Sequence, residues 1–143
     1  MFQKDYILRM IEMIGDLIAA ILGLIKKGDL EQAEKMIERG YYELLRRDAS
    51  FFQLIPKEHL TDKLLGDHHY TNGHLTILAE LFYAEAMVSK ASDKRDNSRV
   101  CFEKSLLLLE FLEQADKTYS EKRIERMNQI KEQLAELSKP KEA

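Results

Sequence analysis

The sequence predicts an all-α protein made of stacked antiparallel helical hairpins and closed by a C-terminal capping helix. Only two prolines occur, Pro56 and Pro140, so long stretches are free of helix breakers. Apolar residues recur at three-and-four spacing, and alternating β-branched runs are absent. The segment 26–33 predicts a tight turn, because Gly28 interrupts one helix and Asp29 caps the next. That turn places two helices side by side in opposite directions.

Length and charge exclude several classes of protein. The chain has 143 residues, the length of one ordinary domain. We assign this domain to residues 1–138 and treat 139–143 as a frayed tail. The net charge of −3 provides no basic surface of the kind that binds nucleic acid. We therefore expect no nucleic-acid partner.

Cysteine usage and hydropathy favour a cytoplasmic location. The single cysteine, Cys101, excludes an intramolecular disulfide and suits a reducing compartment. No signal peptide is recognisable, since Gln3, Lys4 and Asp5 interrupt the first apolar residues. The longest apolar run, residues 17–25, is far shorter than the roughly twenty residues that span a bilayer. We expect no membrane partner.

The first expected helix, residues 5–27, has few polar side chains. Asp5, Arg9, Glu12 and Asp16 recur at helical spacing and form one narrow stripe. Because the rest of its surface is apolar or small, this helix requires burial on two sides, either at the centre of the domain or between subunits. We expect a homodimer in which the first helix joins the subunits through Ile7, Met10, Ile14, Ile18, Ile21, Leu22 and Ile25.

The next part of the chain is expected to hold one long and one short helix. The long helix spans about 30–47 and completes the first hairpin. Residues 51–55 are too few for a helix and are interpreted as an apolar connector. Pro56 suits the first position of a short helix over 57–65, which Gly66 ends.

A second hairpin and a closing helix complete the expected fold. Residues 67–73 form a polar loop that ends in an Asn-Gly turn signal. Helices over 74–91 and 97–114 then pair as the second hairpin. The last helix starts near Thr118, which forms a capping box with Glu121. Its one-sided apolar pattern is typical of a helix that covers the end of a stack.

The two predicted hairpins share a pattern of small and bulky residues. The pattern is Leu17, Ala20, Ile21, Leu24, Ala33, Ile37 and Gly40 in the first, and Phe82, Glu85, Ala86, Ser89, Ser98, Phe102 and Ser105 in the second. Small residues allow helix backbones to cross closely. The pattern resembles tetratricopeptide repeats, in which two helices form a unit of about 34 residues. This resemblance implies a right-handed array of hairpins that binds other proteins.

In that family the first helix of each pair lines a concave groove for an extended peptide. The matching positions of the second hairpin, which the resemblance implies as partner-binding residues, are Glu80, Tyr83, Met87 and Lys90. The matching positions of the first hairpin are mostly apolar, so another chain or a helix of this one is expected to fill the groove there. The start of the chain, residues 5–12, is also similar to a family of short uncharacterised bacterial helical proteins, which implies a bacterial origin.

The four histidines, at positions 59, 68, 69 and 74, are the first candidates for chemistry. Histidine is a common metal ligand, so His68, His69 and His74 are candidate ligands. Their spacing argues against a site, because two of them are adjacent and no His-x3-His pair occurs. We interpret them as capping and hydrogen-bonding residues. A metal-dependent or ligand-binding enzyme built on residues 67–74 stays open as the alternative.

The remaining reactive side chains are interpreted structurally. Cys101 is expected to be a buried small hydrophobe. Four carboxylates lack the Glu-x2-His motif of di-iron bundles, and we interpret them as surface charge: Glu80, Glu85, Glu110 and Glu113. No Gly-rich phosphate loop or serine nucleophile elbow is present. The expected function is a non-catalytic protein–protein interaction module or scaffold that needs no cofactor and binds an unidentified protein or peptide.

Overall fold

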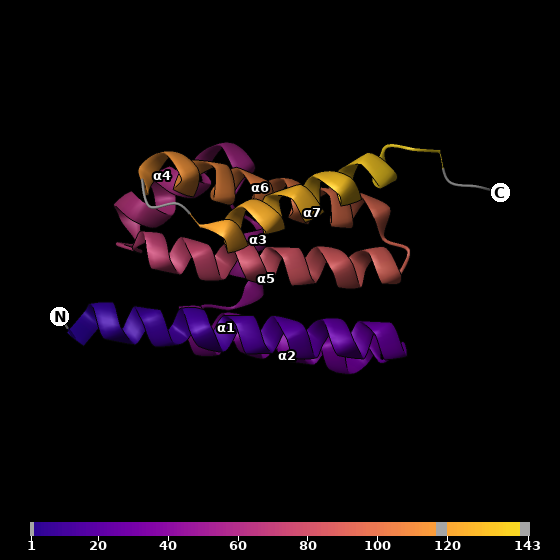
Figure 1. Ribbon diagram of the computed structural model, residues 1–143, viewed down its shortest axis with the longest axis horizontal. Coiled ribbons are helices and arrows are strands. Elements are labelled where there is room, and N and C mark those ends of the chain that lie inside the picture. Colours follow the sequence, from indigo (N-terminus) through magenta and orange to yellow (C-terminus); the bar gives the residue numbers. More distant parts are fainter. Residues whose placement is uncertain (1, 117–119, 141–143) are drawn as a thin grey trace.

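The computed structural model describes residues 2–116 and 120–140 of the chain. In these ranges the protein is helical and contains no strand, which confirms the predicted all-α class (Figure 1). The helical segments are α1 (Phe2–Lys27), α2 (Leu30–Leu45), α3 (Ala49–Gln53), the 3₁₀ segment η1 (Lys57–His59), α4 (Leu60–Asp62), the π-helical segment η2 (Lys63–Asp67), α5 (Asn72–Ala91), α6 (Arg95–Ala115) and α7 (Glu121–Leu137).

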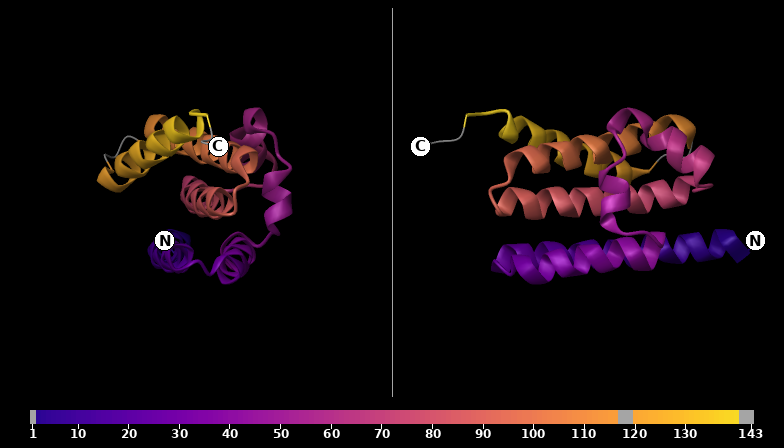
Figure 2. Two further views of the ribbon diagram at one scale, coloured as in Figure 1. Left: turned by 90° about the vertical axis from the view of Figure 1, so that its right-hand side faces the viewer. Right: turned by 180° about the vertical axis from the view of Figure 1, so that it is seen from behind.

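Two long antiparallel hairpins, α1–α2 and α5–α6, lie on top of each other (Figures 1 and 2). The end-on view in Figure 2 shows α5 above α1 and α2, with α6 and α7 on its far side. The short segments α3 to η2 run along one side of the stack and connect the two hairpins. Because α5 contacts α1, α2 and α6, its buried residues point in every direction: Leu75, Ile77, Leu78, Ala79, Leu81, Phe82, Tyr83, Ala84, Ala86, Val88 and Ser89.

The central helix of the domain is therefore α5, and α1 is an outer helix. The few polar residues of α1 suggested a helix buried on two sides, at the domain centre or between subunits. In the structure α1 packs one face against α5 and α2, through Met10, Ile14, Ile18 and Ile21. The centre of the domain belongs to the helix with apolar residues on all sides.

The predicted turn between α1 and α2 has a well-defined geometry. Gly28 adopts a φ of +84°, and its N–H donates to the Ile25 carbonyl at 3.0 Å. The next N–H, that of Asp29, donates to the Leu24 carbonyl at 2.9 Å. The Asp29 side chain accepts a hydrogen bond of 3.3 Å from the N–H of Gln32. Residues 26–33 thus end one helix with a Schellman motif and cap the next, as the sequence predicts.

The turn between α5 and α6 repeats this arrangement without a glycine. Asp93 adopts a φ of +62°, and its N–H donates to the Lys90 carbonyl at 3.1 Å. The following N–H, from Lys94, donates to the Ser89 carbonyl at 2.8 Å. Asparagine and aspartate tolerate the left-handed conformation better than other residues with a Cβ. The two hairpins therefore turn in the same way.

Small residues lie where the helices approach most closely. A Cβ added to Gly40 of α2 would lie 2.9 Å from the Leu17 side chain of α1. Ser98 and Ser105 of α6 are fully buried, and their hydroxyls donate to α5 carbonyls at 2.8 and 2.7 Å. The shared pattern of small residues thus corresponds to close helix contacts in both hairpins.

The middle of the chain is more helical than predicted. Residues 51–55 were expected to be non-helical, but α3 forms a five-residue helix over Ala49–Gln53. The helix expected over 57–65 does not end at Gly66. The N–H of His68 donates to the Lys63 carbonyl at 3.1 Å, five residues back, so the segment continues through the glycine as a π turn.

The start of α5 also differs from the prediction. The expected Asn-Gly turn is the first part of the helix, which begins at Asn72. Thr71 is the N-cap: its hydroxyl accepts the N–H of His74 at 3.3 Å, and its own N–H donates to the His74 ring nitrogen Nδ1 at 3.0 Å. Gly73 lies directly against Ile7 of α1, with no space for a Cβ. A glycine is needed at position 73 because α5 and α1 approach closely there, and not because the chain turns.

The closing helix α7 begins at Glu121, and Ser120 is its N-cap. The Ser120 hydroxyl accepts a hydrogen bond of 3.2 Å from the N–H of Arg123. Thr118, the predicted cap, lies outside the described residues, and so do residues 141–143 of the predicted tail. Among the helices that the structure describes, none combines the length and the apolar character needed to cross a membrane.

Candidate functional site

The four partner-binding residues implied by the repeat resemblance lie on the side of α5 next to α7. Arg126 of α7 donates two hydrogen bonds to the Glu80 carboxylate, at 2.8 and 3.0 Å. Its guanidinium also lies over the ring of the buried Tyr83, 4.0 Å from the centroid. The acidic and aromatic parts of this surface are thus engaged within the chain.

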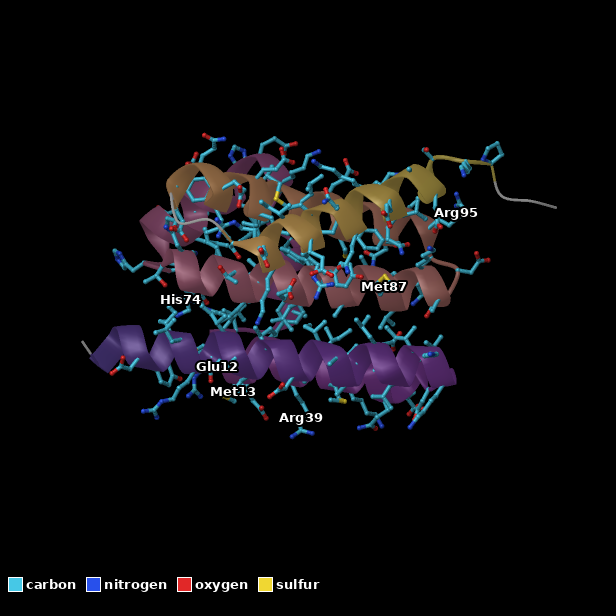
Figure 3. All side chains as sticks on the ribbon, in the orientation of Figure 1. Glu12, Met13, Arg39, His74, Met87 and Arg95 are labelled. Carbon is cyan, nitrogen blue, oxygen red and sulfur yellow. The ribbon has the colours of Figure 1, made fainter. Side chains whose placement is uncertain are left out.

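The other two residues of this set are engaged in the same way. The Lys90 ammonium donates to Gln133 and Glu136 of α7, at 2.5 Å each. Met87 is half-buried against the core, on the part of α5 beneath α7 (Figure 3). A helix of this chain, α7, therefore covers this face of α5.

The residues expected to join two subunits divide into two groups. Met10, Ile14, Ile18 and Ile21 are at most 4% exposed and belong to the core of their own chain. These four side chains are not available to a second subunit. The others are partly buried and pack against the same core: Ile7, Leu22 and Ile25.

An apolar groove remains on the outer face of the first hairpin, and we call it the outer groove. It has a volume of about 170 Å³ and lies between α1 and α2, with Met13, Leu17, Met36 and Gly40 among its lining residues. Met13 is 57% exposed. Figure 3 shows Met13 projecting together with Glu12 and Arg39 from the side of the hairpin that faces away from the other helices.

The four histidines lie in separate environments. His74 caps α5, and burial lowers its pKa. His68 lies edge-on against the ring of Phe51, with 4.9 Å between ring centroids. His59 and His69 are exposed. Within the described residues, no three His, Cys, Asp or Glu side chains are grouped so that they could hold a metal ion.

A cavity with a largely polar lining lies between α2, α3, α5 and the start of α6, and we call it the interhelical cleft. Its volume is about 510 Å³, within the range of about 300–1,000 Å³ typical of small-molecule sites. Glu85 of α5 lies on its floor, and three other carboxylates line it: Glu34, Glu38 and Asp48.

Side chains from three helices converge on the Glu85 carboxylate. Its Oε2 accepts hydrogen bonds from the Tyr41 hydroxyl of α2, at 3.0 Å, and from the Cys101 thiol of α6, at 3.5 Å. Its Oε1 accepts from the side-chain amide of Gln53 in α3. The ammonium of Lys104 in α6 donates to the Gln53 carbonyl at 2.8 Å. This network joins α2, α3, α5 and α6 below the cleft.

Burial dominates the protonation behaviour of this network. It raises the pKa of Glu85, against the opposing effect of its three hydrogen-bond donors and of Lys104. It also raises the pKa of Tyr41 well above 10.0 and lowers that of Lys104. Burial and the Glu85 charge raise the pKa of Cys101 far above the usual thiol range. Cys101 is buried, as predicted, and its raised pKa disfavours the thiolate that nucleophilic chemistry requires.

The site at Glu85 was not predicted from the sequence, in which Glu85, Glu80 and Glu113 were interpreted as surface charge. In the structure Glu85 is half-buried. Glu80 and Glu113 pair with arginines of α7. Glu110 is exposed, as expected. The sequence does contain one signal for this site, which is charge among apolar residues. Glu85 lies among mostly buried residues of α5, and Lys104 lies in an apolar part of α6.

Comparison of this chain with protein-family models, with curated proteins and with solved structures found no match.

Proposed function

We propose that this chain is a non-catalytic protein–protein interaction module that forms a homodimer through the outer groove. The observation behind the proposal is the apolar lining of that groove, with Met13 57% exposed at its edge. The opposite face of the same hairpin is already covered by α5. A second protein surface on the outer face buries the side chains that the fold leaves in water.

A second copy of the chain would meet charges of both signs around this groove. Glu12 and Asp16 are exposed on α1, whereas Arg39 is exposed on α2, where it pairs with Glu43 of the same helix at 3.6 Å. In a two-fold symmetric pair, the same surface patch meets itself in the opposite sense. Antiparallel packing then places the acidic α1 of one subunit against Arg39 of the other.

The remaining features support binding over chemistry. In the described part of the chain the thiol is buried and the histidines are dispersed among structural contacts. The small residues at the helix crossings support a relationship to tetratricopeptide-like hairpins. We also propose that the module acts in the cytoplasm, where a free thiol such as Cys101 persists.

Sedimentation velocity at micromolar concentration tests the dimer. We expect a dimer for the natural chain and a monomer for Met13→Glu, because the substitution replaces apolar contact surface with a carboxylate that must lose its hydration in the contact. Leu54→Glu is the matched control: it adds the same charge at a side chain that is 81% exposed directly after α3, and the dimer should persist. A natural chain that sediments as a monomer, or a Met13→Glu variant that stays dimeric, contradicts the proposal.

A further inference from the structure

The interhelical cleft is a cavity of about 510 Å³ whose polar floor is built from several helices. Glu85 and Ser89, both on α5, form part of that floor. Ile37 of α2 and Val88 of α5 also line the cleft and provide aliphatic surface. The cleft therefore combines a charged end with apolar walls, which is the general character of small-molecule sites.

The Glu85 end of the cleft offers acceptors, because the donors that reach Glu85 are already bonded to it. An ionised carboxylate has about four lone-pair sites, and Glu85 receives three donors, from Tyr41, Gln53 and Cys101. Oε1 receives only one of these, so it keeps acceptor capacity. The Ser89 hydroxyl accepts from the amide of Asn97 at 2.7 Å and keeps a second lone pair. A ligand that donates hydrogen bonds and accepts none is complementary to such a floor.

The charges around the cleft select the sign of the ligand. Glu34, Glu38 and Asp48 line the cleft and form no ion pair within the described residues. Lys94 is the one lysine or arginine among the described lining residues. Lys104 reduces the charge at Glu85 from below, but its ammonium is bonded to the Gln53 carbonyl. The summed field of the lining therefore attracts cations.

An organic cation fits these features better than a metal ion. Three of the atoms that surround Glu85 are hydrogen-bond donors, which would be repelled by a bound metal. An alkylammonium group has three N–H donors and no acceptor, which matches the floor. Its methylene chain can pack on Ile37 and Val88. A second cationic group further along the chain can then reach Glu34 and Glu38.

We infer that the interhelical cleft binds a primary alkylammonium ion on an aliphatic chain, with the ammonium at Glu85 and Ser89 and the chain directed toward the acidic residues of α2. Two sources carry this chemistry: a free di- or polyamine, and the side chain of a lysine in a peptide. The site is separate from the outer groove, so it is independent of the proposed dimer.

Calorimetric titration with spermidine, cadaverine and Nα-acetyl-lysine-methylamide tests the inference, with 1,6-hexanediol as an uncharged probe of similar length. We expect saturable binding of the amines and none of the diol. Stronger binding of spermidine and cadaverine indicates a free polyamine, whereas stronger binding of the lysine derivative indicates a peptide side chain. Either order supports a primary-ammonium site. Absence of saturable binding by all three amines at low salt overturns it.

Charge-neutral variants locate the site. Glu85→Gln should weaken binding at least tenfold. Glu38→Gln, which neutralises an exposed side chain of the cleft, should weaken it by about threefold. Glu132→Gln is the matched control, since it removes an equal charge from the exposed face of α7 and should change affinity less than twofold. Equal weakening by all three variants indicates attraction by net charge alone and overturns the site.

A spectroscopic readout separates the site from the fold. The side-chain amide of Gln53 donates to Glu85, so its two NMR proton signals should shift on addition of cadaverine. Sodium chloride at the same ionic strength should leave these signals in place. If Glu85→Gln perturbs the fold, the titration of Glu38→Gln and the Gln53 signals of the natural chain still decide the question. Identical shifts with salt and with amine contradict the inference.

Discussion

The two hairpins turn in the same way but differ in what covers them. Both turns contain a left-handed residue, Gly28 in the first and Asp93 in the second, and both make the same pair of backbone hydrogen bonds. The α5–α6 hairpin is covered on one side by the first hairpin and on the other by α7. The α1–α2 hairpin is covered by α5 and, beside α2, by the short α3, and its outer groove stays open.

This difference separates the two kinds of surface in the molecule. In the covered hairpin, charged groups such as Glu85 and Lys104 are enclosed and need hydrogen-bond partners. In the open hairpin, charged groups are solvated, and the apolar side chains that line the outer groove have no helix over them. A buried polar network and an exposed apolar groove are therefore two results of the same stacking, one at the centre and one at the edge.

The largest expected effect comes from the covered hairpin. Phe82→Ala removes a fully buried ring of α5 and should lower the free energy of unfolding by about 3–5 kcal/mol. Met13→Ala, in the open groove, should change the stability of the monomer by less than about 0.5 kcal/mol. Urea unfolding below the dimer dissociation constant measures both. Similar losses for the two variants would show that the hairpins are equally buried.

A smaller effect is expected where the hairpins meet. Gly73→Ala places a methyl group against Ile7 and should lower stability by about 1–3 kcal/mol. Gly23→Ala is the control, because nothing lies within 4 Å of a Cβ at this exposed position of α1. Alanine is the better helix former, so this control should gain about 0.5–1 kcal/mol. Thermal unfolding of both variants gives opposite shifts if the contact is as close as described.

The turns themselves give the third test. Gly28→Ala forces a residue with a Cβ into the left-handed region and should cost about 1–2 kcal/mol. Gly28→Asn should cost less than about 1 kcal/mol, because asparagine tolerates this conformation, as the aspartate of the second turn does. Urea unfolding of the pair compares them directly. Equal losses would indicate that the first turn requires glycine for a reason other than backbone conformation.

The sequence predicted local structure better than it predicted burial. The 26–33 turn follows from Gly28 and Asp29 alone, because a left-handed glycine and a cap act over a few residues. The role of Gly73 depends on Ile7, a residue of another helix, so the Asn-Gly pair predicted a turn that does not exist.

The site at Glu85 was unpredictable for the same reason. Its hydrogen-bond donors come from α2, α3 and α6, and no local spacing brings these helices together. The outer groove was partly predictable, since the apolar character of α1 indicated an excess of apolar surface. The side of α1 that stays open depends on where α5 packs. The periodicity of the sequence does not give the position of α5.

A further expected effect is the pH dependence that Glu85 adds to stability. Burial raises its pKa in the folded protein above the ordinary value of 4.5, so the folded state binds the proton more readily than the unfolded state. In the window between 4.5 and that raised value, the contribution of Glu85 to the free energy of unfolding falls as pH rises and grows as pH falls.

Glu85→Gln removes this contribution, so the natural chain should gain stability relative to the variant on acidification from about pH 7 to pH 5, by at most about 1.4 kcal/mol per pH unit. Urea unfolding at several pH values gives the difference, in which the titration of all other groups cancels to first order. A natural chain that loses stability relative to Glu85→Gln on acidification would mean that the hydrogen bonds to the carboxylate outweigh its burial. The covered hairpin would then hold Glu85 as a stabilised anion, and the contrast between the two hairpins would lie in their hydrogen bonds and not in the cost of enclosing charge.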